Sequence, residues 1–272
     1  VDMLTRFFTN KLRSTSSRGR GMGGEQVAWR LKGHAEHPYW RWVATWARAM
    51  RKPSDFGFSD DRFHLPELVV NQTLVEARED HPDQLFSTPA IGLAEERVET
   101  RRTLTERCEA AAELLAGAES GVAWCHLNDE SALLTRLIPD AVEVSGADSP
   151  DEKEAKLAGF SDGTIKFLVT KPSIGAWGLN WQHSHRATYF VSHSYEQWYQ
   201  AVRRMWRFGQ TKPVQVDVIA SEGGSNILAN LQRKADLADG MFTALVEHMN
   251  DALAVERHTY ENRLEIPSWL AS

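Results

Sequence analysis

The stretch that decides the fold reads Gln197-Trp-Tyr-Gln-Ala-Val-Arg-Arg-Met-Trp-Arg-Phe-Gly-Gln210. Nothing between Tyr195 and Arg207 breaks a helix, and Gly209 stands where a helix would stop. On such a helix Gln200, Arg204 and Arg207 fall at positions i, i+4 and i+7, so one amide and two guanidinium groups share a face. Guanidinium groups suit a phosphate chain because each can donate two parallel hydrogen bonds. A basic surface helix without a ligand is the alternative that spacing alone leaves open.

A second feature is the glycine-containing segment Thr170-Lys-Pro-Ser-Ile-Gly-Ala-Trp-Gly-Leu-Asn-Trp-Gln182, which follows an apolar strand predicted at 165–169. Ligands of open α/β sheets bind outside the carboxyl ends of the strands. Gly175 and Gly178 would let a phosphate or sugar approach the backbone closely. The alternative is a turn between a strand and a helix that needs glycine for its geometry.

Short apolar strands alternate with helices through the last two thirds of the chain, which predicts a parallel, doubly wound α/β sheet. The predicted strands are 122–125, 141–144, 165–169, 188–191 and 214–218. The predicted helices are 95–116, 129–137, 149–160, 195–207, 225–235 and 241–255.

The first third of the chain has a different character. We expect helices at 1–13 and 38–51 and an extended segment at 65–77. Prolines then mark a linker, so we divide the chain into 1–85 and 86–272. The helix at 38–51 is rich in tryptophan, and we favour a core stripe over a surface that stacks on bases.

Composition indicates a soluble globular protein, with 42% hydrophobic and 25% charged residues among 272. No apolar run is long enough to span a membrane, and there is no signal peptide, so we expect no membrane partner and a cytoplasmic location. Residues 1–52 are basic, with 11 Lys or Arg against 3 Asp or Glu, and could meet phosphates. The chain begins with Val1 instead of methionine, which favours a fragment.

The stretch Gln200–Gln210 resembles motif VI of superfamily 2 helicases, most closely the Snf2-like branch, whose pattern is Q-A-x-D-R-x-H-R-I-G-Q. The matching residues are Gln200, Ala201, Arg204, Arg207, Gly209 and Gln210. Arg203 stands in place of the acidic residue, Trp206 in place of histidine and Phe208 in place of an aliphatic residue.

The segment Thr170–Gln182 is similar to motif V of the same family, S-x-R-A-G-G-x-G-L-N-L. The matching residues are Gly175, Gly178, Leu179 and Asn180, while Ala176 replaces a glycine. The two motifs follow one another in the family's order, which is more specific than either motif alone.

The resemblance implies a RecA-like helicase C-terminal lobe, preceded by a mainly helical remnant of the first lobe that looks like phage-type helicases, in a bacterial or phage-infected cell. It implies an ATP-dependent DNA helicase or translocase, with RNA not excluded. Arg207 would be the arginine finger and Arg204 its neighbour. Gln200, Gly178 and Asn180 would complete the ATP contacts. Nucleic acid would meet Thr170, Lys171, Ser173 and Gly175.

Two motifs that the family needs are missing from the sequence. There is no G-x-x-x-x-G-K-[ST] phosphate loop and no Asp-Glu-x-His/Asp box to hold Mg²⁺. We therefore expect half of an ATP site, with Mg²⁺ held by an N-terminal lobe supplied in cis or in trans. His183, His185 and His193 are weak evidence for a metal site, and we predict none.

A non-catalytic nucleic-acid-binding or scaffolding module with a degenerate helicase fold is the alternative function. The missing phosphate loop and Arg203 favour this alternative. The retained Arg204 and Arg207 count against it.

Overall fold

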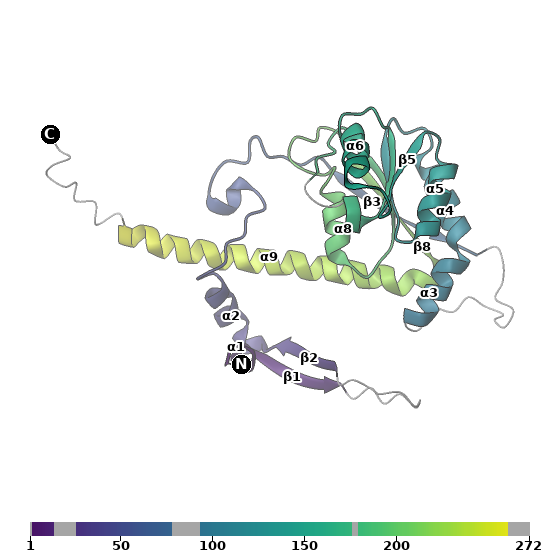
Figure 1. Ribbon diagram of the computed structural model, residues 1–272. Helices are drawn as coiled ribbons and strands as arrows, with labels where there is room; N and C mark the ends of the chain where they lie inside the picture. The colour runs from purple at the N-terminus through teal and green to yellow at the C-terminus, as the bar shows by residue number, and fades with distance from the viewer. Residues whose placement is uncertain (1, 14–25, 78–92, 176–178, 261–272) are drawn as a thin grey trace, which may run out of the picture. The chain divides into compact units, whose positions relative to one another are not determined.

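The computed structural model describes residues 2–13, 26–77, 93–175 and 179–260 (Figure 1). The chain forms two compact units, Asp61–Asp236 and Val1–Asp60 with Leu237–Ser272, which are described separately. The boundary expected between residues 85 and 86 lies outside the described residues and stays a prediction.

The larger unit is built on a six-stranded sheet in the order β3-β8-β7-β4-β6-β5, and every pair of neighbours is parallel. The strands are β3 (Leu68–Val75), β4 (Gly121–Trp124), β5 (Ala141–Val144), β6 (Phe167–Thr170), β7 (Arg186–Phe190) and β8 (Val214–Ser221). The α/β fold with a parallel sheet that is predicted from the sequence is thereby confirmed. The extended segment expected at 65–77 is the edge strand of this sheet, paired along its length with β8.

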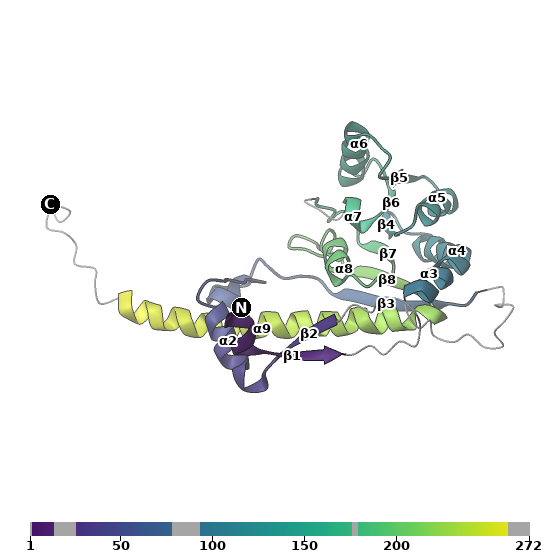
Figure 2. The ribbon, with the colours of Figure 1, turned by 60° about the horizontal axis from the view of Figure 1, so that its bottom comes forward.

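Helices cover both faces of the sheet (Figure 2). One face carries α3 (Leu93–Arg102), α4 (Leu104–Leu115) and α5 (Asn128–Leu137), and the other carries α6 (Pro150–Ser161), α7 (Pro172–Gly175) and α8 (Tyr195–Val202). Each layer has its own core. The α4 and α5 side packs Cys108 and Leu134 against the sheet, and the α6 and α8 side packs Phe160, Trp181 and Met205. Strand β4 reads as a continuous apolar run because both its faces are buried, whereas the edge strand β3 is partly exposed and carries polar residues at 71–73.

Two predicted helices have different limits in the structure. The helix expected at 95–116 breaks at Thr103, whose hydroxyl donates to the Glu99 carbonyl oxygen at 2.8 Å. The two helices expected at 225–235 and 241–255 are one, α9 (Ser225–Tyr260), which follows a 3-10 turn at Glu222–Gly224. Gly240 lies inside α9, where a glycine costs only about 1 kcal/mol.

The smaller unit contains a β-hairpin that the sequence analysis did not expect. After α1 (Asp2–Phe7), strand β1 (Phe8–Arg13) pairs antiparallel with β2 (Gln26–Leu31) along its whole length, so the helix predicted at 1–13 is wrong from Phe8 onward. Pairing with a distant strand overrides the local helical pattern there.

The tryptophan-rich helix, α2 (Glu36–Val43), is shorter than the predicted 38–51 and follows a 3-10 turn at Gly33–Ala35. Trp40 is buried, whereas Trp46 is 64% exposed beyond the helix end, so only part of the stripe is core. A second 3-10 turn spans Pro53–Phe56. Within the described residues, no helix is long and apolar enough to cross a membrane.

Candidate functional site

The helix that leads to the predicted arginines is shorter than expected. The Ser194 hydroxyl caps the start of α8 by accepting from the Gln197 N–H at 3.3 Å. The helix ends at Val202, and residues 203–209 form a turn instead of the helical continuation predicted to Arg207. Gly209 closes the turn with a φ of 97°, in the left-handed region that favours glycine.

Tertiary contacts explain this early end. The Arg204 carbonyl accepts from the Trp181 N–H at 2.9 Å, and the Met205 side chain is fully buried in the core. The face expected from Gln200, Arg204 and Arg207 at helical spacing is therefore wrong, because only Gln200 lies on the helix.

The two arginines nevertheless converge on one atom. Nη1 of Arg204 donates to the Leu179 carbonyl oxygen at 2.6 Å, and Nη1 of Arg207 approaches the same oxygen at 3.5 Å. Arg204 is buried, and its Nε has no hydrogen-bond partner among the described residues. Burial, and then the Arg207 charge, lower the pKa of Arg204. Two like charges held this close favour an anionic ligand beside them.

Glutamine side chains fasten the glycine-containing segment to the arginine turn. Nε2 of the buried Gln210 donates to the carbonyl oxygens of Gln182 at 2.9 Å and of Ser184 at 3.1 Å. The Gln182 side-chain amide in turn donates to the Phe208 carbonyl oxygen. Asn180 is exposed at the segment's edge, and its Nδ2 lies 3.4 Å from Oε1 of Gln182. The two segments singled out from the sequence thus form one connected polar network.

The predicted nucleic-acid residues divide into buried and accessible ones. Thr170 is fully buried, and its hydroxyl donates to the Val144 carbonyl oxygen at 3.0 Å, so its side chain lies in the protein interior and not at the surface. Ser173 is exposed on α7, and Lys171 reaches Oδ1 of Asn128 at 2.5 Å. Gly178, predicted to contact ATP, lies outside the described residues.

Gly175 is buried for a packing reason. A Cβ at this position would lie 2.9 Å from Cγ2 of Thr170, 3.2 Å from the Trp181 ring and 3.3 Å from the Trp124 ring. This crowding supports the structural role that the sequence analysis kept as the alternative to phosphate contact.

Gly175→Ala is therefore expected to lower the free energy of unfolding by about 1–3 kcal/mol, because the added methyl group overpacks the core. Urea unfolding followed by circular dichroism measures this change. Gly146→Ala is the matched control, since a Cβ at Gly146 would meet nothing within 4 Å. Equal stability of the two variants would contradict the packing role of Gly175.

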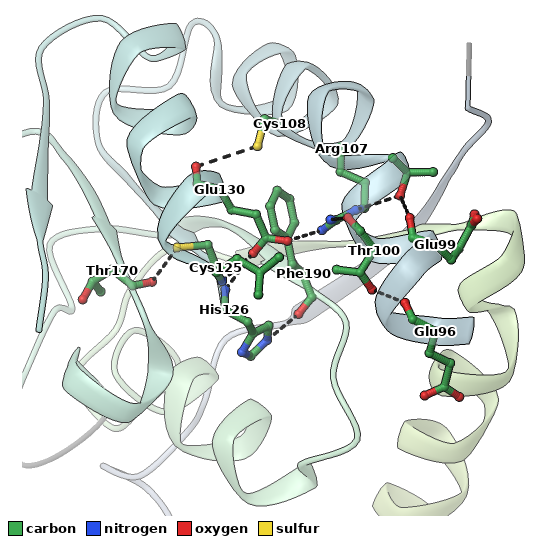
Figure 3. Close-up of polar contacts among 12 residues, drawn as sticks. Glu96, Glu99, Thr100, Arg107, Cys108, Cys125, His126, Glu130, Thr170 and Phe190 are labelled. Atoms are coloured by element: carbon green, nitrogen blue, oxygen red, sulfur yellow. Dashed lines mark hydrogen bonds and ion pairs between the residues drawn. The ribbon is translucent and has the colours of Figure 1, made fainter. Parts of the chain in front are cut away.

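A buried ion pair that the sequence analysis missed lies at the carboxyl ends of the strands. Nη1 of Arg107 on α4 is 2.7 Å from Oε1 of Glu130 on α5, and the two side chains are 5% and 1% exposed. Oε2 of Glu130 accepts the backbone N–H groups of His126 and Leu127, both at 2.9 Å. Figure 3 shows this cluster beside the ring of Phe190. The pair ties α4 to the start of α5.

The signal for this pair was present in the sequence. Arg107 falls on the apolar stripe of α4, next to Cys108 and before Ala111 and Leu115, where a charged residue needs a buried partner. A cavity of about 190 Å³ borders the pair and is lined by Thr100 and Ser221, among others.

His126 lines the same cavity, and its side chain is held by a hydrogen bond within the protein. Its Nε2 lies 2.9 Å from the Phe190 carbonyl oxygen, to which it can only donate. Burial lowers the pKa of His126, so the imidazole is neutral at neutral pH. Within the described parts of the chain, no group of three or more His, Cys, Asp or Glu side chains is placed to hold a metal ion.

Comparison with known proteins gives likenesses to solved structures only, since no family model and no curated protein matches the chain. The chain is similar to the C-terminal part of the Fun30 ATPase domain, with 16% identity, a TM-score of 0.41 and 54% of each chain covered. It is similar to T4 UvsW, with 13% identity, a TM-score of 0.46 and 64% of this chain and 40% of that chain covered.

A DEAD box protein from the hyperthermophile Methanococcus jannaschii is similar at 20% identity and a TM-score of 0.41, with 47% of this chain and 36% of that chain covered. The chain thus spans about half of the Fun30 structure and less of the other two.

Proposed function

We propose that this chain is the C-terminal portion of an ATP-dependent DNA helicase or translocase of superfamily 2, in its Snf2-like branch. The observation that carries the proposal is the polar network between the two motif segments. Residues 179–182 and 203–210, which belong to the two segments quoted separately from the sequence, bind each other and bring Arg204 and Arg207 to one carbonyl group.

ATP is the proposed nucleotide, and the arginines would face its phosphates. Arg207 is exposed and weakly held, so it can reach an anion and stabilise the charge that develops on the transferred phosphoryl group. Arg204 is buried beside Arg207, and its hydrogen bond to the Leu179 carbonyl oxygen holds the turn against the glycine-containing segment. Gln200, Asn180 and Gly178 remain proposed contacts to ATP, of which Gly178 lies outside the described residues.

A second RecA-like lobe, in cis or in trans, would supply the phosphate loop and the ligands of Mg²⁺. The sequence contains no phosphate loop, and the described residues offer no cluster of metal ligands. Magnesium bound there would neutralise charge on the phosphates. This chain's contribution is to position two guanidinium groups against them.

Nucleic acid is the proposed partner of the loop that follows β6. Lys171 and Ser173 would contact the backbone, because an ammonium and a hydroxyl group are suitable donors to phosphate. Thr170 and Gly175 are buried, and they would contribute by fixing the shape of the loop that presents Lys171 and Ser173. DNA is preferred to RNA only through the Snf2-like pattern.

The alternative is a nucleic-acid-binding or scaffolding module without catalysis. One observation favours it, namely that Arg204 is buried and bound to a carbonyl group of the protein. DNA binding by the protein assembled with its phosphate-loop lobe distinguishes the helicase or translocase from the non-catalytic module. We expect ATP to change the affinity for a DNA oligonucleotide, as measured by fluorescence anisotropy. A DNA affinity that depends on salt but does not change when ATP is added would favour the non-catalytic module.

A further inference from the structure

The segment immediately before β3 packs against the turn that carries the arginines. We call residues 61–67 the strap. Nε1 of Trp206 donates to the carbonyl oxygen of Pro66 in the strap at 2.7 Å. The rings of Phe63 and Phe208 meet edge to face, with centroids 5.2 Å apart and planes at 87°. The strap therefore holds the turn at two points.

These two points lie on either side of the proposed finger. Trp206 and Phe208 are the residues directly before and after Arg207. Anchoring both neighbours restricts the backbone of Arg207, while its own side chain stays exposed. The start of β8, which follows the turn, is joined to the strap as well, because the Val214 N–H donates to the Glu67 carbonyl oxygen at 2.9 Å.

The same tryptophan explains two departures from the motif VI pattern. Arg203 stands where the pattern has an acidic residue, and Trp206 stands where it has histidine. In the structure these two residues contact each other, with Cζ of Arg203 4.4 Å from the Trp206 ring centroid and 5.1 Å from that of Tyr199. A guanidinium group over an aromatic face is a stabilising contact. The two departures thus form one interaction.

We propose that the strap and Trp206 are positioning elements for Arg207, which they hold in the direction that the finger needs. The inference rests on the proposed function and adds to it the residues that set the geometry of the finger. Such positioning matters because a displacement of about 1 Å in a catalytic group can cost about 10²-fold in rate.

The anchoring can be measured in the 272-residue chain without any ligand. Trp206→Phe removes the indole N–H but keeps a ring over Arg203, and Trp206→Leu removes both. We expect amide hydrogen exchange in residues 203–210 to quicken about fivefold in Trp206→Phe, the effect of one lost hydrogen bond, and more in Trp206→Leu. Exchange in β4 should stay unchanged, which separates local loosening from global unfolding.

A phenylalanine pair provides the matched control. Phe63→Ala should quicken exchange in the turn, whereas Phe58→Ala should not, because Phe58 is 68% exposed and lies outside the strap. Unchanged exchange in both Phe63→Ala and Trp206→Leu would overturn the anchoring.

The positioning role is tested by ATP hydrolysis of the protein assembled with its phosphate-loop lobe. We expect kcat to fall at least about tenfold in Trp206→Leu, with KM for ATP within about twofold, and Trp206→Phe to recover much of the loss. Looser exchange with an unchanged kcat would reduce the strap to a structural role. Absence of hydrolysis in the unsubstituted assembly would overturn the proposed function and the positioning role, whereas the exchange data would still decide the anchoring.

Discussion

Replacing Arg207 by alanine is expected to lower kcat for DNA-stimulated ATP hydrolysis by about 10³-fold or more in the protein assembled with its phosphate-loop lobe. The variant removes a guanidinium group that would stabilise charge on the transferred phosphoryl group. Arg207→Lys should recover little, because an ammonium group lacks the planar fork that binds two phosphate oxygens. Steady-state phosphate release at saturating DNA measures the effect.

The fall in kcat of Arg207→Ala should occur without a fall in the protein's stability. Arg207 is exposed and makes a single long hydrogen bond, so Arg207→Ala should change the free energy of unfolding by no more than about 0.5 kcal/mol. Arg136→Ala, an exposed arginine on α5, is the control for removal of a positive charge. A kcat for Arg207→Ala close to that of the unsubstituted protein would show that the finger is assigned to the wrong residue.

The largest effect on stability is expected from the buried ion pair. Arg107→Ala should lower the free energy of unfolding by about 3–5 kcal/mol, because it leaves the Glu130 carboxylate buried without its partner. The same change removes the hydrogen bonds from Arg107 to the Thr100 carbonyl oxygen and to the Thr103 hydroxyl group. Urea unfolding followed by circular dichroism measures the loss.

An exposed ion pair in the same unit is the comparison. Lys212 and Glu119 are 3.3 Å apart, with side chains 55% and 83% exposed, so Glu119→Ala should leave the stability nearly unchanged. If Arg107→Ala were as stable as Glu119→Ala, the ion pair would not be what joins α4 to α5.

Local pattern was sufficient for the sheet, because strands buried on both faces are continuous apolar runs that few other structures share. The strand at 122–125 illustrates this, since it lies in the sheet near its predicted limits. The strand at 214–218 also lies in the sheet, although Gln215 and Asp217 interrupt its apolar residues. The sequence also predicted that the segments around Leu179 and Arg204 belong to one site. That prediction came from the resemblance to the two motifs and stays a prediction, because the hydrogen bond from Arg204 to the Leu179 carbonyl oxygen shows only that the two segments are in contact.

Features that depend on distant partners could not be read from local pattern. The helix expected to reach Arg207 ends at Val202 because the Arg204 carbonyl oxygen accepts from the Trp181 N–H and the Met205 side chain is buried in the core. Helix propensity contains no information on either contact. Strand β1 likewise depends on pairing with β2 across residues 14–25. The burial of Thr170 follows from the position of β5, whose Val144 carbonyl accepts its hydroxyl.

ATP hydrolysis by this chain, alone and after addition of a lobe that carries a phosphate loop, tests the half-site most directly. We predict no hydrolysis by the chain alone, with or without DNA, and DNA-stimulated hydrolysis that requires Arg207 once the lobe is added. DNA-stimulated hydrolysis by the chain alone would contradict the account, because the phosphates would then be held by residues other than those proposed.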